Sequence, residues 1–95
     1  MGMEGLFERI REEYGVEIRD GEDMTGAWRL VESLKERGWV VYIITGKGRE
    51  QVDAWHPNFG SLFAQFGETP NFGSVLEGIC TTALLVKELE KKGAV

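Results

Sequence analysis

The fold is decided by residues 23–44, which read DMTGAWRLVESLKERGWVVYII. Apolar residues recur every three or four positions up to Leu34, which is the spacing of an amphipathic helix, and Gly38 ends that helix. The segment from Trp39 to Ile44 is then apolar at every position. Because a half-exposed strand alternates apolar with polar residues, this run predicts a strand that is buried on both faces.

Length and composition predict one domain, residues 1–95, with one hydrophobic core. Hydrophobic residues make up 42% of the chain, which is enough for a core and too many for a disordered segment. A chain of this size buries only about two-thirds of the surface of its unfolded form, so we expect modest stability. Its abundant aromatic residues are compatible with a homodimer that hides a hydrophobic face.

Charge and residue usage exclude several classes of function. The net charge of −5 disfavours binding to nucleic acid, because phosphate contacts need an excess of cations. The single Cys80 and the single His56 allow no internal disulfide and no paired metal ligands, so we expect neither a metal nor a cofactor. No apolar run approaches the ~18 residues of a membrane span and no signal peptide is apparent, which predicts a cytoplasmic protein without a membrane partner.

Hydrophobic spacing and turn residues predict six elements in the order α-α-β-β-β-α. The helices are expected over residues 4–14, 22–37 and 74–91, and the strands over residues 39–45, 50–56 and 61–66. Asp23 or Asp20 caps the second helix, and Ser74 with Glu77 forms a capping box at the start of the last. This order predicts an α+β fold, a thin sandwich in which a three-stranded antiparallel meander carries helices on its faces.

Three groups of residues resemble a known family. They are Asp23-x-x-x-Ala27-Trp28-x-x-Val31-Glu32-x-Leu34, then Gly38-Trp39, and finally Leu76-x-x-Ile79-Cys80-x-x-Ala83-Leu84. Together they resemble the phage ABA sandwich domain, over about residues 15 to 90. The small residues that usually precede the Ile-Cys pair are replaced here by Glu77-Gly78. The resemblance implies helices on the two faces of a small antiparallel sheet, a phage or prophage origin, and no catalytic residues.

The turn at residues 45–49 is a candidate anion site, because its two glycines expose backbone N–H groups beside Lys47 and Arg49. The stretch lacks the spacing of a Walker loop and joins two strands instead of opening a helix. A hairpin turn with solvated charges is the simpler interpretation.

Two further places are candidate binding sites. Trp55 and His56 could form a recognition patch at a strand end, although a strand tryptophan is more often covered and a lone histidine beside Pro57 is usually at the surface. Phe72 lies in the flexible segment 67–73, where it either contacts a ligand or packs as a hydrophobic staple on the last helix. Cys80 falls in an apolar stripe and is expected in the core.

The residues favour a non-enzymatic protein, since His56 has no second catalytic group near it in the sequence. With the resemblance, the primary hypothesis is a phage or prophage protein that binds a host protein or a small anionic ligand. The alternative is an RNA-binding module, because α-β-β-β-α also describes double-stranded-RNA-binding domains. The negative net charge of the chain disfavours that alternative, as does the Glu77 carboxylate at the start of the last helix.

Overall fold

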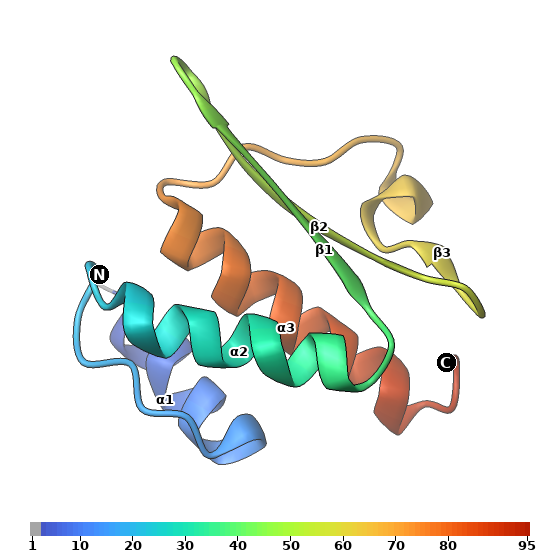
Figure 1. Ribbon diagram of the computed structural model, residues 1–95, viewed down its shortest axis with the longest axis horizontal. Helices are drawn as coiled ribbons and strands as arrows, with labels where there is room; N and C mark the ends of the chain where they lie inside the picture. Colours follow the sequence, from blue (N-terminus) through green and yellow to red (C-terminus); the bar gives the residue numbers. More distant parts are fainter. Residues whose placement is uncertain (1–2) are drawn as a thin grey trace.

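In the computed structural model, residues 3–95 are described, apart from the side chains of residues 65 and 66. They form three α-helices and a three-stranded antiparallel sheet (Figure 1). The elements are α1 (Glu4–Tyr14), α2 (Met24–Glu36), β1 (Val40–Gly46), β2 (Arg49–His56), β3 (Gly60–Ser61), the 3₁₀ helix η1 (Phe63–Phe66) and α3 (Val75–Lys91). The α+β class and the order α-α-β-β-β-α are confirmed.

The helix ends follow from local hydrogen bonding. Asp23 caps α2, since its Oδ1 accepts the Gly26 N–H at 3.0 Å. The Trp39 N–H donates to the Leu34 carbonyl at 3.1 Å, and Gly38 takes φ 92°. This cap reverses the chain, so that only residues 37–39 separate α2 from β1.

The predicted capping box at the start of α3 is present with one shift. The Ser74 hydroxyl accepts the Glu77 N–H at 3.1 Å, as expected. The Glu77 carboxylate accepts the N–H of Gly73 at 2.6 Å, one residue before the predicted donor. Ser74 therefore satisfies a backbone donor that the helix leaves unpaired, and Glu77 ties the residue before the cap to the first turn of α3.

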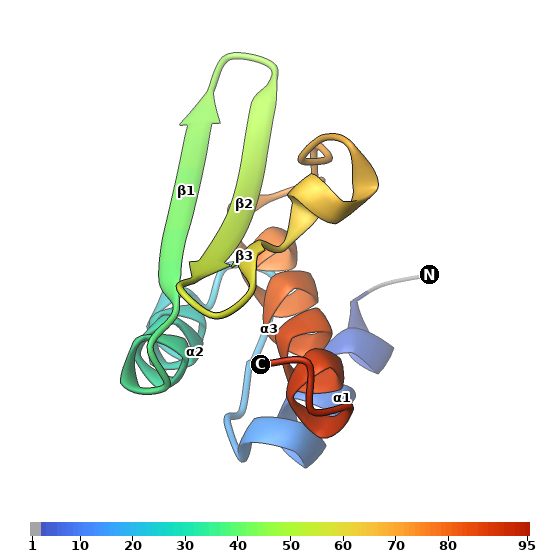
Figure 2. The ribbon, with the colours of Figure 1, turned by 90° about the vertical axis from the view of Figure 1, so that its right-hand side faces the viewer.

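β1 and β2 form a hairpin whose register runs without a bulge from Val40 opposite Trp55 to Gly46 opposite Arg49. The two strands therefore lie within one residue of their predicted bounds. The tip of the hairpin extends beyond α2 and α3 (Figures 1 and 2). Most of β1 is exposed as a result.

The third predicted strand, over residues 61–66, is wrong for most of its length. Only Gly60 and Ser61 pair with β2, and the chain then turns into η1. The carboxylate of Asp53 explains the turn, because it accepts the Ser61 hydroxyl at 2.6 Å and the Phe63 N–H at 3.2 Å. Leu62 and Phe63 are both buried, which the alternating sides of a strand would not allow.

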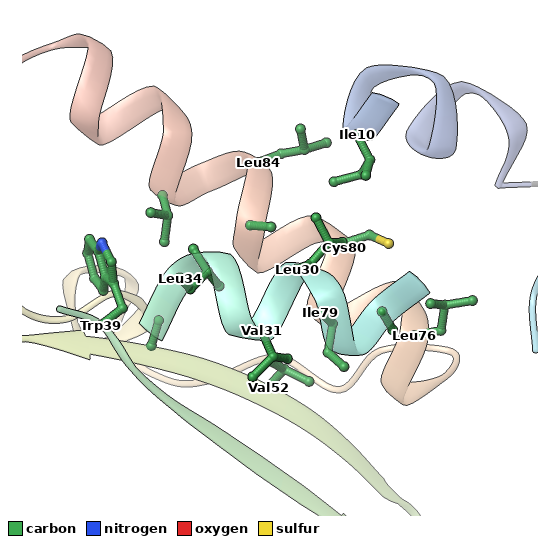
Figure 3. Packing of buried hydrophobic residues seen from close by; sticks show 14 of the residues in the cluster. Ile10, Leu30, Val31, Leu34, Trp39, Val52, Leu76, Ile79, Cys80 and Leu84 are labelled. Carbon is green, nitrogen blue, oxygen red and sulfur yellow. The ribbon is translucent and has the colours of Figure 1, made fainter. Parts of the chain in front are cut away.

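The helices form two layers on the same side of the sheet. α2 and α3 contact each other and pack on β1 and β2, respectively. α1 packs on α3, where the Tyr14 hydroxyl donates to the Ala83 carbonyl at 2.6 Å. Figure 3 shows Val31 and Ile79 directed from the helices toward Val52 on the sheet, with Ile10 of α1 on the far side of α3.

The prediction that both faces of strand 39–44 are buried is therefore wrong. Cross-strand pairing places Val41 and Ile43 on the helix side, with Ala54 and Val52. The other face carries four large apolar side chains that are between 39% and 50% exposed, and we call this set the open-face patch: Val40, Tyr42, Ile44 and Trp55. Among the described residues, α2 and α3 pack on the opposite face of the sheet, and α1 packs on α3.

Candidate functional site

The structure does not bring the predicted site residues together. Lys47 and Arg49 lie at the tip of the β1–β2 hairpin, and Trp55 and His56 lie at the opposite end of β2 (Figure 1). Phe72 precedes α3 on the segment that follows η1. Each residue is therefore considered with its own neighbours.

Lys47 lies in the two-residue turn and Arg49 is the first residue of β2, and both side chains are exposed. Among the described residues, no ion pair to either cation is found. The space beside Gly46 and Gly48 is open, and Gly48 takes φ 75°, as a tight hairpin turn requires. The hairpin interpretation accounts for this geometry without a bound anion.

His56 is buried, contrary to the expectation of a surface residue. Its Nδ1 accepts the Asn58 N–H at 3.1 Å, and its Nε2 lies 3.2 Å from the Arg37 carbonyl oxygen. Because a carbonyl only accepts, this geometry assigns Nε2 as the donor to Arg37 and Nδ1 as the acceptor from Asn58. The Trp39 ring lies 5.0 Å away, centroid to centroid, so His56 joins β2 to the end of α2 as a structural residue.

Trp55 faces the opposite way and is 39% exposed, although a covered position was the simpler expectation. It lies across from Val40 on the open face of the sheet. The two neighbours Trp55 and His56 thus have opposite environments, as the alternation of a strand requires.

Phe72 packs at the start of α3. Its ring is half-buried against Gly78 in α3 and meets Phe63 edge-on at 6.1 Å between centroids. The Phe72 N–H donates to the Glu50 carbonyl at 2.7 Å, which ties the segment to β2. Its contacts serve packing at the start of α3.

A polar cluster that the sequence did not predict joins the three helices. Arg37 Nε donates to Glu90 at 2.7 Å, and Arg37 Nη2 donates to the Tyr14 hydroxyl at 3.1 Å. Burial raises the pKa of Tyr14 to about 12, and burial likewise raises the pKa of the Cys80 thiol to about 12. Each polar group of the cluster is directed at another protein group, an arrangement typical of a structural network. No local pattern connects residues 14, 37 and 90, so the sequence carries no signal for it.

An apolar groove beside β1 was also missed. It lies between the outer side of β1 and α2, and its lining includes Trp28, Val31, Lys35, Val41 and Ile43. Trp28 is 51% exposed and Ile43 is 36% exposed. Apolar periodicity marks such residues as core, and it does not show that the chain leaves them uncovered.

Asp23 gives a pH prediction for the fold around α2. The backbone N–H groups of Arg19 and Gly26 donate to its carboxylate, at 2.9 and 3.0 Å, and they hold the pKa of Asp23 below its usual value. A carboxyl whose pKa is lower in the folded state stabilises the fold at any pH above its unfolded-state pKa, which is about 3.9. That stability is lost as the pH falls through the folded-state pKa. The melting temperature should therefore drop on acidification below about pH 4, and less steeply in Asp23→Asn.

Thermal melts followed by circular dichroism between neutral and acidic pH measure this effect. Asp20→Asn is the matched control, since Asp20 is exposed and lies in the same segment. Equal pH slopes for wild type and Asp23→Asn would contradict the assignment.

Within residues 3–95, no group of three or more His, Cys, Asp or Glu side chains is placed to hold a metal ion. In the same residues, no helix combines the length and the apolar character needed to cross a membrane. Comparison with models of known protein families, with curated proteins and with solved structures finds no match to this chain. The resemblance to the phage ABA sandwich domain stays a prediction.

Proposed function

We propose that this chain is a non-enzymatic protein-binding module whose contact surface is the open-face patch. The observation that carries the proposal is the exposure of Val40, Tyr42, Ile44 and Trp55 together on one face of β1 and β2. The resemblance adds a phage or prophage origin, and with it we propose a host protein as the partner. The residue usage adds a cytoplasmic setting in the bacterial host.

The chemistry of the patch supports protein contact. Tyrosine and tryptophan are enriched at the centres of protein interfaces, where they bury a large area at low entropic cost. Tyr42 and Trp55 provide two such anchors, and the half-buried polar residues Asp53 and Gln51 lie on the same face, opposite Tyr42 and Ile44. Lys47 and Arg49 lie at the hairpin tip, next to Ile44, so we expect the partner to be acidic at that end.

The RNA-binding alternative gains no support from the cations of α3. Lys91 pairs with Glu13 at 2.6 Å, and Lys87 lies 4.4 Å above the Tyr14 ring. Both lysines are thus engaged with α1, while the start of α3 presents Ser74 and Glu77. A phosphate backbone would need free cations at that start.

Retention from a bacterial lysate, followed by titration of the purified partner, tests the proposal. We expect a protein that is retained by wild type and lost with Tyr42→Ala or Trp55→Ala, each of which should weaken the titrated affinity by about tenfold or more. Met24→Ala is the matched control, since Met24 is an exposed apolar residue on α2 that lies off the patch. If the patch variants retain every partner of wild type with unchanged affinity, the proposal is wrong.

A further inference from the structure

β1 is an edge strand with unpaired backbone groups. The strand order β1-β2-β3 leaves the outer side of β1 without a neighbouring strand (Figure 2). The carbonyls of Ala54 and Glu50 accept from Leu62 and Phe72, so both β2 residues turn their backbone away from β1. In an antiparallel pair, the backbone N–H and C=O groups of their partners Val41 and Thr45 then also point outward. The same holds for the backbone groups of Ile43, which lies between them.

Nothing in β1 protects this edge. Natural edge strands are usually blunted by a charged residue, a proline or a bulge. The strand reads VVYIITG, which contains neither a charge nor a proline, and its register with β2 has no bulge. The edge is therefore competent to accept another strand along its length.

The side chains beside the edge are apolar on both faces of the sheet. Ile43 and Trp28 line the groove on the helix side, and Tyr42 and Ile44 stand on the open side. These four side chains are between 36% and 51% exposed.

We infer that β1 pairs antiparallel with β1 of a second copy of this chain, about a two-fold axis at Ile43. The inference goes beyond the proposed function and does not depend on it, because it rests on the unpaired backbone groups of β1, and the open-face residues Tyr42 and Ile44 only flank that edge. Pairing would join two sheets into one and place the two open-face patches side by side.

The outward backbone groups select the register. An axis at Ile43 places Val41 opposite Thr45, so the outward N–H and C=O groups of all three residues gain partners. An axis at Tyr42 would place Thr45 opposite Trp39, whose N–H already donates to Leu34. The register at Ile43 therefore leaves fewer unpaired groups.

A second copy suits this edge because the pairing is self-complementary. Tyr42 of each chain meets Ile44 of the other, and Ile43 meets itself. Strands with charged residues often repel their own copies at the axis, whereas residues 40–46 carry no charge. The acidic excess of the chain therefore lies outside the paired strands.

Sedimentation equilibrium of the full chain tests the dimer. We expect a concentration-dependent dimer for wild type. Ile43→Lys should raise the dissociation constant of the dimer at least about tenfold, since that change places two ammonium groups against each other at the axis. Glu8→Gln makes the same change in net charge on the exposed surface of α1 and should leave the equilibrium unaltered. A wild-type chain that stays monomeric at every accessible concentration would overturn the inference.

Disulfide trapping tests the register without depending on the fold of the lysine variant. In the register at Ile43, positions 42 and 44 form a pair without hydrogen bonds, about 4.5 Å apart between Cα atoms, which a disulfide can span. Mixing Tyr42→Cys chains with Ile44→Cys chains under mild oxidation should yield the mixed dimer. Efficient linking of Tyr42→Cys to itself, or no linking in the mixture, would overturn this register.

Discussion

Trp39→Ala should lower the free energy of unfolding by about 3–5 kcal/mol, the largest loss that we expect from one substitution in this chain. Trp39 is 2% exposed at the junction of α2 and β1. Its ring lies near those of His56 and Phe59, at 5.0 and 6.3 Å between centroids, and its Nε1 donates to Glu90 at 3.4 Å. Alanine would leave a large cavity and remove this hydrogen bond to Glu90.

This loss is a large part of the roughly 5–10 kcal/mol that holds a domain of this size together. Urea unfolding followed by circular dichroism measures it. Trp28→Ala is the matched control, because Trp28 is half-exposed, and in dilute protein it should cost less than about 1 kcal/mol. Similar losses for the two tryptophans would show that Trp39 is not a core residue.

Gly78→Ala should lower the free energy of unfolding by about 1–2 kcal/mol, although alanine favours helices. A Cβ atom at Gly78 would lie 2.7 Å from Val52 Cγ2 and 2.8 Å from Phe72 Cδ2. Gly78 thus sets how closely α3 approaches β2, and an added methyl group would push the helix from the sheet.

Gly5→Ala provides a control with the same chemistry and the opposite expected sign. Gly5 lies in α1, and a Cβ atom added there would meet nothing within 4 Å, so alanine should stabilise the fold by up to about 0.5 kcal/mol. Differential scanning calorimetry of the two variants measures whether each substitution raises or lowers the stability of the fold. Stabilisation by Gly78→Ala would mean that α3 and β2 are less tightly packed.

Most elements could be predicted because their signals are local. Asp23, Gly38 and Ser74 fix helix ends through hydrogen bonds to residues within a few positions. The third strand could not be predicted, because its end depends on Asp53, which lies on another strand and captures the Ser61 hydroxyl and the Phe63 N–H. A pattern in residues 61–66 contains no information about that carboxylate.

The candidate site was predicted less well than the fold. Alternation in β2 places His56 on the side of Val52 and Ala54, so the sequence held a usable signal that His56 is buried. The apolar run 39–44 correctly marks β1 as a strand with two apolar faces. It could not show that this chain covers only one of them, because a second copy or a partner can cover the rest.

Amide hydrogen exchange in β1, resolved by residue with NMR, tests most directly the claim that this strand is an interface. The Tyr42 and Ile44 amides point toward β2 and should exchange slowly at any protein concentration. The Val41, Ile43 and Thr45 amides point outward. Pairing between copies should slow their exchange at high protein concentration, and dilution should make their exchange fast again. Fast exchange of these three amides at every concentration, beside protected Tyr42 and Ile44, would contradict the account.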